Sequence, residues 1–179
     1  IVYADQVGSI CLSSEIAPGA VGNARGYGSV DLQTYRTLAT QVASGGWTVI
    51  SGGRKNTNSG YDAAIVGGRS NVCSATTAFI GGGYSNSATT GQAITVCGGQ
   101  SNSCASNYGS VVGGRQNAVA SGCLDGFVGG GYHNTLTGSN SGIVISGGTF
   151  NTASGARSTT SGGYRNTNSG LCAAIGGGK

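Results

Sequence analysis

The sequence predicts an all-β fold, a β-solenoid whose coils are about 15 residues long. Three features that recur with one period support this. Gly-Gly pairs follow one another at intervals of 15 to 17 residues, a β-branched residue stands two positions before every pair, and an asparagine stands three positions after nearly every one. Because so short a repeat cannot bury its apolar face alone, successive repeats are expected to stack and bury each other. The pairs begin at Gly52, Gly67, Gly82, Gly98, Gly113, Gly130, Gly147, Gly162 and Gly177.

The residues before each pair predict the first strand of a coil. The position two before the pair is Ile or Val in eight of nine repeats, which suits an inward-facing strand position. The position four before is mostly small and shares this face, because side chains alternate along a strand. A second strand is expected after the asparagine. The inward residues of the first strand are Ile50, Ile65, Ile80, Val96, Val111, Val128, Ile145, Thr160 and Ile175, and those of the second are Asn58, Cys73, Ala88, Cys104, Val119, Leu136, Ala153 and Asn168.

The Gly-Gly pair and its asparagine predict a tight corner between the strands. Such a corner needs residues with positive φ, which glycine adopts most readily and asparagine next. Asparagine amides stacked about 4.8 Å apart can also form a hydrogen-bonded ladder along the axis. A phosphate-binding glycine loop would need a helix after the glycines, and no helical period follows them. We therefore assign a structural role to Asn56, Asn71, Asn86, Asn102, Asn117, Asn134, Asn151 and Asn166.

The composition excludes several other classes of chain. Glycine supplies 37 of 179 residues, proline one, and charged residues 8%, which is typical of low-complexity, disordered chains. The constant phase of the Ile/Val position argues against disorder, since disordered tracts keep no register. Glycine does not occupy every third place, which excludes collagen.

The outward positions of the first strand carry no charge and include several apolar side chains. A long, flat face of this kind usually meets a partner, and a homo-oligomer with its axis along the solenoid would bury it. We expect a homotrimer, in which identical coils meet at each level. The outward residues are Val49, Ala64, Phe79, Thr95, Ser110, Phe127, Val144, Thr159 and Ala174, flanked by Ser51, Val66, Gly81, Cys97, Val112, Gly129, Ser146, Ser161 and Gly176.

The coil pattern resembles the head repeats of trimeric autotransporter adhesins, and residues 40–179 match it in period. The form Ser-Thr-Thr-Ser-Gly-Gly-Tyr-Arg-Asn-Thr-Asn-Ser-Gly at 158–170 is more similar to repeats of bacteriophage tail fibres and other virion appendages, as is the segment 24–33. The resemblance implies a left-handed parallel β-roll, trimeric assembly and an extracellular place on a virion or cell surface, in adhesion or host attachment. Since some coils exceed the adhesin period, corner loops are expected to vary at 123–125 and 139–140. A similar roll occurs in a plant antifreeze protein, so the fold does not fix the function.

The N-terminal 39 residues lack the repeat and hold the sole proline, Pro18. We interpret 1–39 as an N-terminal cap or a segment that docks to other fibre or virion proteins, and 40–179 as the β-roll domain. The sequence has no initiator methionine, signal peptide or transmembrane run, so we expect a processed or partial chain and no membrane insertion.

One corner is predicted to present a stripe of arginine and tyrosine. It is the candidate binding surface for a host glycan or receptor, through charge and ring stacking; the alternative is a solvated corner with no ligand. Nucleic acid is not an expected partner, since the stripe is sparse and no recognition motif is present. The candidate residues directly follow the Gly-Gly pairs and are Arg54, Arg69, Tyr84, Arg115, Tyr132 and Tyr164.

No constellation for catalysis or a cofactor is evident. His133 has no acid in its own coil, and Asp62 and Asp125 are four coils apart, too far for a pair of glycosidase carboxylates. The six cysteines form no Cys-x-x-Cys motif, so a metal site is not expected, and a Cys104–Cys123 disulfide across adjacent coils or bonds between chains remain open.

Three functions are compatible with this sequence. The first is a non-enzymatic structural or adhesive fibre segment, the second an ice-binding β-solenoid, and the third a carbohydrate-binding module that uses the Arg/Tyr corner. Ice binding would use a hydroxyl-rich face that Val72 and Ala118 interrupt. That face comprises Thr57, Ser87, Ser103, Thr135, Thr152 and Thr167 with Ser59, Ser74, Thr89, Thr137, Ser154 and Ser169.

Overall fold

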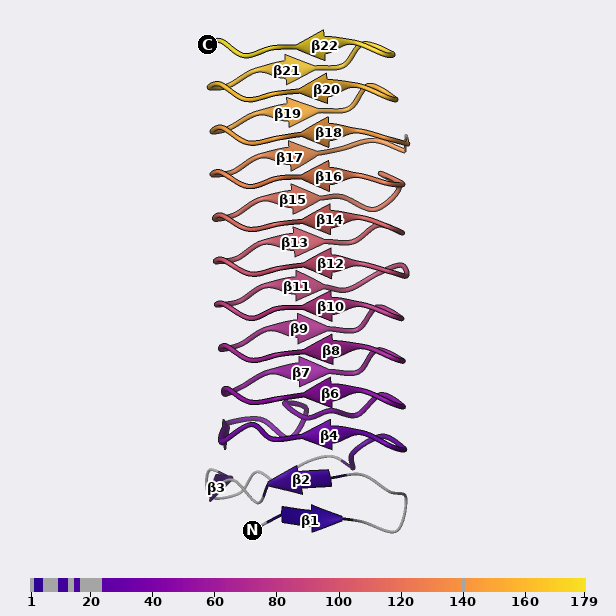
Figure 1. Cartoon of the computed structure of the whole chain (residues 1–179), viewed down its shortest axis with the longest axis vertical. Coiled ribbons are helices and arrows are strands. Elements are labelled where there is room, and N and C mark those ends of the chain that lie inside the picture. Colours follow the sequence, from indigo (N-terminus) through magenta and orange to yellow (C-terminus); the bar gives the residue numbers. More distant parts are fainter. Residues whose placement is uncertain (1, 5–9, 13–14, 17–23, 140) are drawn as a thin grey trace.

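The protein is a β-solenoid in which short parallel strands stack in two sheets (Figure 1). The computed structural model describes residues 2–4, 10–12, 15–16, 24–139 and 141–179. Within these residues every regular element is a strand, and none is a helix. The all-β solenoid predicted from the Gly-Gly period is therefore confirmed.

The first strand of every coil belongs to one sheet of twelve strands. From β2 onward neighbouring strands pair in parallel and in register, so that Ile65 lies between Ile50 and Ile80, whereas β1 pairs antiparallel with β2. Each coil is bonded to the next through its backbone; for example, the Val66 N–H donates to the Ile80 carbonyl at 3.0 Å. The strands are β6 (Val49–Ile50), β8 (Ala64–Ile65), β10 (Phe79–Ile80), β12 (Thr95–Val96), β14 (Ser110–Val111), β16 (Phe127–Val128), β18 (Val144–Ile145), β20 (Thr159–Thr160) and β22 (Ala174–Ile175), preceded by β1 (Val2–Ala4), β2 (Ile10–Leu12) and β4 (Val30–Asp31).

The second strand of each coil belongs to a sheet of eight strands on the other side of the core. These strands also pair in parallel, as Ser87 does with Val72 and Ser103. The remaining strands, β3 (Glu15–Ile16) and β5 (Tyr35–Arg36), form a small sheet near the N-terminal end. The second sheet contains β7 (Thr57–Asn58), β9 (Val72–Cys73), β11 (Ser87–Ala88), β13 (Ser103–Cys104), β15 (Ala118–Val119), β17 (Thr135–Leu136), β19 (Thr152–Ala153) and β21 (Thr167–Asn168).

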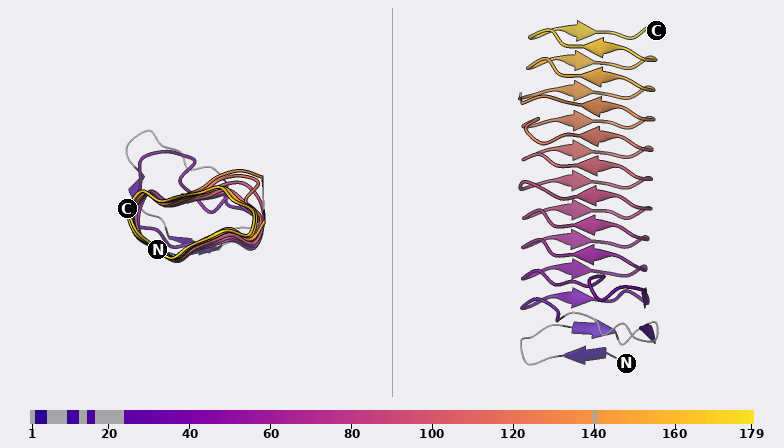
Figure 2. Two further views of the ribbon diagram at one scale, coloured as in Figure 1. Left: turned by 90° about the horizontal axis from the view of Figure 1, so that it is seen from above. Right: turned by 180° about the vertical axis from the view of Figure 1, so that it is seen from behind.

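The two corners of a coil differ in how strictly their length is kept. Six residues separate the strands at every Gly-Gly corner, as 51–56 do between β6 and β7. At the second corner the connection varies from five residues, as in 59–63, to seven, as in 120–126. Seen along the axis, the coils superpose on a flattened outline and diverge mainly at one end (Figure 2). The expectation of length variation near 123–125 agrees with this; Asn140, in the other expected loop, lies outside the described residues.

The core is one layer of side chains between the sheets. The inward positions predicted for the two strands are buried in all coils up to the last, where Ile175 is half-buried. Each coil thus contributes one Ile, Val or Thr from the first strand and one smaller or comparable residue from the second. Asn58 and Asn168 are the polar exceptions in the second strand; the Asn58 Nδ2 donates to the Ala63 carbonyl at 2.9 Å, and the Asn168 Nδ2 to the Ala173 carbonyl at 3.2 Å. A buried amide is tolerated there because its donors are paired.

The corner asparagines form a ladder inside the solenoid. Each of Asn56 to Asn151 is fully buried, and its Oδ1 accepts a hydrogen bond from the backbone N–H of the next asparagine, as from Asn117 to Asn102 at 3.0 Å. The Asn102 Nδ2 donates to the carbonyls of Gly98 in its own coil (2.8 Å) and Gly114 in the next (2.9 Å). The amide therefore closes its own corner and binds the neighbouring coil.

The expectation that asparagine itself takes the positive-φ position is wrong. That conformation belongs to the residue immediately before each asparagine, with φ between 55° and 58°. Asparagine is needed for its inward amide, whereas the preceding side chain points outward and varies. The positive-φ residues are Lys55, Ser70, Ser85, Ser101, Gln116, His133, Phe150 and Arg165.

The two glycines of a pair are under different constraints. Gly114 has φ of +81°, and a Cβ built on it would lie 2.2 Å from the Gly131 carbonyl oxygen of the next coil. By contrast, a Cβ on Gly113 would meet nothing within 4 Å. The same holds for Gly52, Gly67, Gly98, Gly147 and Gly162, so in these six coils only the second glycine is required by the fold of a single chain, whereas the first glycines Gly82 (φ +142°) and Gly130 (φ +148°) also adopt a conformation that favours glycine.

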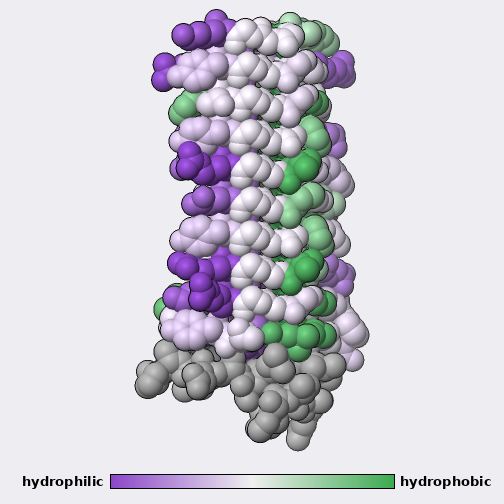
Figure 3. Space-filling view, turned by 60° about the vertical axis from the view of Figure 1, so that its left-hand side comes forward, coloured by the Kyte–Doolittle hydropathy of each residue, from purple (hydrophilic) through white to green (hydrophobic). Residues whose placement is uncertain are grey.

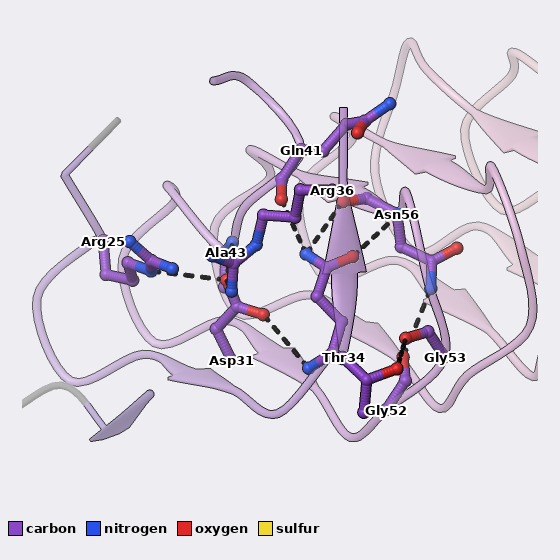
Figure 4. A network of polar contacts seen from close by, with 10 residues as sticks. Arg25, Asp31, Thr34, Arg36, Gln41, Ala43, Gly52, Gly53 and Asn56 are labelled. Carbon is purple, nitrogen blue, oxygen red and sulfur yellow. Dashed lines mark hydrogen bonds and ion pairs between the residues drawn. The ribbon is translucent and has the colours of Figure 1, made fainter. Parts of the chain in front are cut away.

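The coil formed by residues 24–43, here called the N-terminal coil, follows the same register with a different core. In β4, Val30 pairs with Val49 and Asp31 with Ile50, so a fully buried aspartate occupies the Ile/Val position. Its Oδ2 lies 3.1 Å from Arg36 Nη2 and 3.3 Å from Arg25 Nε (Figure 4). The sheet thus continues below residue 40, into the segment assigned from the sequence to a cap or docking region.

The asparagine ladder begins in this coil with a glutamine. The Gln33 Oε1 accepts the Asn56 backbone N–H at 2.9 Å, which is the bond that an asparagine makes in every later coil. Its Nε2 donates to the carbonyls of Gln41 (2.7 Å) and Asn56 (3.1 Å). The longer side chain of Gln33 therefore supplies the first rung of the ladder from a different backbone path.

Candidate functional site

The six candidate binding residues lie in one column along the Gly-Gly corner. Successive residues directly after the pairs are joined by parallel bridges, as Arg54 is to Arg69 and Arg69 to Tyr84. Because strands in a sheet lie about 4.8 Å apart, the column is a straight line of side chains with that step. We call it the corner stripe; its members are Arg54, Arg69, Tyr84, Gln100, Arg115, Tyr132, Thr149 and Tyr164.

Arginines of this corner stack on aromatic rings of the adjacent coil or of their own. The Arg69 guanidinium carbon lies 4.9 Å from the Tyr84 ring centroid, and that of Arg115 lies 4.3 Å from the Tyr132 centroid. Arg165 lies 5.0 Å from the Tyr164 centroid. All three distances fall within the range of cation–π attraction. The stacking holds each flexible arginine in a defined position on the surface.

A second aromatic group surrounds His133 at the same corner. Its ring centroid lies 5.0 Å from that of Phe150, and Phe150 lies 5.1 Å from Tyr132 and 6.1 Å from Tyr164. These side chains come from successive coils and cover the upper part of the corner. His133 is therefore surrounded by rings, which gives it a packing partner in place of a catalytic acid.

Charge is distributed unequally between the two corners. Asp62 and Asp125 lie at the second corner and are exposed, together with Arg157. In the described part of the chain, the ion pairs join Asp31 to Arg25 and Arg36 alone. The remaining basic residues, Arg54, Lys55, Arg69, Arg115, Arg165 and Lys179, follow Gly-Gly pairs and have no carboxylate partner among the described residues. The Gly-Gly corner is therefore the cationic edge of the rod.

The first sheet presents an uncharged outer surface, here called the apolar face. Its most exposed apolar side chains are Val66 (48%), Val112 (45%), Phe79 (40%) and Phe127 (38%). The Phe79 ring lies against Gly81: a Cβ there would be 3.4 Å from Phe79 Cε1, and Phe127 and Gly129 repeat the arrangement at 3.3 Å. Each ring therefore packs beside a glycine, which is itself required because a Cβ would lie 2.2 Å (Gly81) or 2.4 Å (Gly129) from a carbonyl oxygen of the next coil. Figure 3 shows hydrophobic groups along one side of the corner and hydrophilic groups along the other, separated by a nearly neutral column.

The second sheet presents a hydroxyl-rich outer surface, here called the hydroxyl face. Thr135 pairs in register with Thr152, and Thr152 with Thr167, so these hydroxyl side chains repeat at the strand spacing. Val72 and Ala118 take the equivalent place in β9 and β15 and interrupt the row. The strands under this face are evenly spaced, but the side chains on it are a mixture of hydroxyl and apolar groups.

The cysteines whose side chains are described are free thiols: Cys73, Cys97, Cys104, Cys123 and Cys172. The Cys104–Cys123 disulfide considered from the sequence is thus not formed. Burial raises the pKa of the Cys73 thiol to about 12 and that of Cys104 to about 11, against opposing backbone hydrogen bonds. These thiols are therefore protonated and unreactive at neutral pH.

The described residues offer neither a metal-binding cluster nor a membrane-spanning helix. Across the described residues, no three or more His, Cys, Asp or Glu side chains gather in a way that could hold a metal ion. Within the same residues, no helix is long and apolar enough to cross a membrane.

Sequence reasoning placed the six candidates by their offset from the glycines, but it missed their neighbours. Tyr35 precedes the first Gly-Gly pair, yet it bridges to Arg54 and lies below Lys55, whose Nζ is 5.5 Å from its ring centroid. Sequence reasoning also missed the ring contacts of Phe150, because they are made with side chains of the coils before and after it. No Gly-Gly pair follows β4, so Tyr35 could have been assigned to the corner only by its distance in sequence from that strand.

The fold and the corner define this chain as a β-solenoid with a cationic, aromatic edge and an apolar face. Comparison with protein-family models, with curated proteins and with solved structures gave no match.

Proposed function

We propose that the protein is a non-enzymatic structural and adhesive segment of an extracellular fibre, belonging to a virion appendage or a cell-surface adhesin, and that it assembles as a homotrimer through the apolar face. The observation that carries this proposal is the flat, uncharged surface built around Val66, Phe79, Val112 and Phe127. An exposed apolar surface of this extent is typical of an interface. The resemblance of the repeats to adhesin heads and tail fibres supports the same function.

The first glycines of the corners support assembly as well. At Gly52, Gly67 and Gly113, neither φ nor any contact within the chain requires glycine. Glycine without an internal reason is often found where another backbone approaches closely. These glycines follow directly after the flanking positions of the apolar face, such as Val66 and Val112, so a second copy packed there would explain them.

A rod is also suited to carry load or span a distance. Every coil is joined to the next by parallel backbone hydrogen bonds on both sheets and by the asparagine ladder. A trimer of such rods would be a stiff spacer with repeated surfaces for attachment, and its N-terminal segment would join it to other fibre or virion proteins. We propose no catalytic role, no nucleic-acid partner and no membrane insertion.

Light scattering on the purified chain tests the assembly. We expect a mass three times the 17.4 kDa of the chain. Replacing Val112 and Phe127 by lysine should give monomers, because six charges would face one another at the axis of the trimer. The matched control replaces Thr135 and Thr152 on the hydroxyl face by lysine and should leave the mass unchanged. A monomeric mass for the native chain would overturn the proposal.

Cys97 offers an independent test, because it is exposed on the apolar face. In a trimer with identical coils at each level, the three Cys97 thiols face a common axis. A short bismaleimide should therefore join chains covalently when Cys172 is replaced by serine. Joining of Cys172 alone, in a chain with Cys97 replaced, would place the interface elsewhere.

Ice binding is the second candidate, favoured by the in-register hydroxyl groups of Thr135, Thr152 and Thr167. A thermal-hysteresis assay separates it from the fibre function. Hysteresis that disappears when Thr152 is replaced by lysine would support ice binding, and its absence in the native chain would remove this candidate.

A further inference from the structure

We propose that the corner stripe binds a linear acidic polysaccharide lying parallel to the rod, with its carboxylate or sulfate groups on the arginines and its sugar rings against the tyrosines. This inference names the ligand class of the adhesive fibre proposed above and rests on that proposal for its biological setting. Its test does not require assembly, since the stripe belongs to each chain.

The charges of the stripe are available for a ligand. Arg69 and Arg115 are exposed, and no described carboxylate lies within ion-pair distance of them. The exposed acids Asp62 and Asp125 lie at the second corner, beyond the strands of the coil. An anion that approaches the Gly-Gly corner therefore meets positive charge without competing side-chain carboxylates.

The arginines are oriented for binding an oxyanion. Arg69 and Arg115 stack on Tyr84 and Tyr132 at 4.9 and 4.3 Å from the ring centroids. Stacking uses the flat side of the guanidinium and leaves the N–H donors in its plane free to form paired hydrogen bonds with a carboxylate or sulfate. Holding the side chain on a ring also lowers the entropy lost when the ligand binds.

The spacing of the arginines fits a linear polymer with sparse charges. From Arg69 to Arg115 the column takes three bridged steps, through Tyr84 and Gln100, and three more steps lead to Tyr164, next to Arg165. At about 4.8 Å per step, the stacked arginines recur about every 14 Å. A nucleic-acid strand carries a phosphate about every 3.4 Å, so most of its charges would have no partner here. A polysaccharide with charges on some of its sugars matches this spacing better.

The tyrosines complete the surface for a sugar chain. Tyr84 is 41% exposed although Arg69 stacks on it. Tyrosine combines an apolar ring with a hydroxyl group, which suits the mixed polar and apolar surface of a sugar. The stripe therefore places both cationic and amphipathic side chains along the line that the polymer would follow.

Binding can be measured on the complete chain with four probes: hyaluronate, which carries a carboxylate on every second sugar, keratan sulfate, which carries sulfate and no carboxylate, neutral dextran and a single-stranded oligonucleotide. We expect hyaluronate or keratan sulfate to bind, dextran not to bind, and the oligonucleotide to bind more weakly than the better acidic polysaccharide. Which of the two binds more tightly identifies sulfate or carboxylate as the preferred group. Equal binding of dextran, tighter binding of the oligonucleotide, or no binding of either acidic polysaccharide would overturn the proposal.

Single arginine variants provide a matched control. Arg115→Gln should weaken binding of the preferred polysaccharide about tenfold, because a hydrogen bond to a charged group is lost. Arg157→Gln removes the same charge from an exposed site at the second corner and should change binding less than twofold. Equal weakening by both would indicate attraction to net charge alone and overturn the stripe as the site.

The mass of each variant, measured by light scattering, separates this inference from the proposed assembly. Loss of binding in an Arg115→Gln trimer supports the stripe. A native monomer that binds polysaccharide through Arg115 refutes the trimer while it supports the stripe. A native trimer that binds no acidic polysaccharide does the reverse.

Discussion

The N-terminal coil and the regular coils of residues 44–179 share one backbone register and differ in what fills it. In the regular coils an Ile or Val from the first strand meets a small residue from the second, whereas Asp31, Arg36 and Arg25 occupy this space in the N-terminal coil. An aliphatic core is non-directional, while a buried ion pair needs each partner in place. The same strand pairing thus tolerates two cores that should respond to mutation in different ways.

The largest effect is expected at the charged core. Asp31→Ala would leave two arginines with little exposed surface and without their carboxylate, and should destabilise the N-terminal coil by about 4 kcal/mol. Asp62→Ala, at an exposed site of a regular coil, is the control and should change little. Urea unfolding followed by circular dichroism measures both. Equal, small effects would show that the aspartate is not essential to this core.

The Gly-Gly corners provide the next largest effect and a matched pair. Gly114→Ala should cost about 3 kcal/mol, because its positive φ and the carbonyl oxygen 2.2 Å from the new Cβ both oppose a side chain. Gly113→Ala has open space and should be neutral or slightly stabilising in a monomer. The same denaturation experiment compares them. Similar losses from both changes would contradict the assignment of the constraint to the second glycine.

Removing one rung of the ladder should have a somewhat smaller effect. Asn102→Ala removes the amide's hydrogen bonds to the Gly98 and Gly114 carbonyls and leaves the Asn117 N–H without its acceptor, and it should cost about 2 kcal/mol. Gln33→Ala tests whether the first rung is equally important to the N-terminal coil. Gln100→Ala, exposed on the corner stripe, serves as the control. A loss no greater than that of Gln100→Ala would show that water replaces the amide.

The smallest effect concerns alkaline pH and belongs to the regular coils. Burial raises the pKa of the Cys73 thiol from 9.0 to about 12. The unfolded chain therefore releases this proton first, and stability is complete below pH 9 and falls as the pH rises toward 12. Cys73→Ala should remove about 1 kcal/mol of this loss at pH 10, and Cys97→Ser none, because Cys97 is exposed. Parallel pH profiles for both variants would contradict this.

Most of the regular coil could be predicted because its signals repeat. The Ile/Val position, the small second-strand position and the length of the Gly-Gly corner recur often enough to fix the period and the inward face. A charged residue at the Ile/Val position (Asp31) and a glutamine in the asparagine ladder (Gln33) each occur in one coil only. Because they do not repeat, the period of the sequence does not reveal them. Likewise, the two glycines of a pair look alike in the sequence, because the contact that constrains Gly114 comes from Gly131, a coil away.

The candidate site was predictable in position but not in its contacts. A constant offset from the glycines placed Arg69, Tyr84 and Arg115 in one column, since every Gly-Gly corner has the same length. The stacking of Arg115 on Tyr132 depends on side-chain direction between coils, which the sequence does not state. Their role in binding stays a prediction that the polysaccharide experiment tests.

The asparagine ladder has a direction, and this gives the chain an order of assembly. Each side-chain amide oxygen, from Gln33 Oε1 to Asn151 Oδ1, accepts the backbone N–H of the ladder asparagine that follows it in sequence. A completed coil therefore offers a fixed acceptor to the next coil while that coil is still being formed. Since a nascent polypeptide emerges from its N-terminal end, the solenoid can grow on its own template, one winding at a time, as the ribosome delivers it.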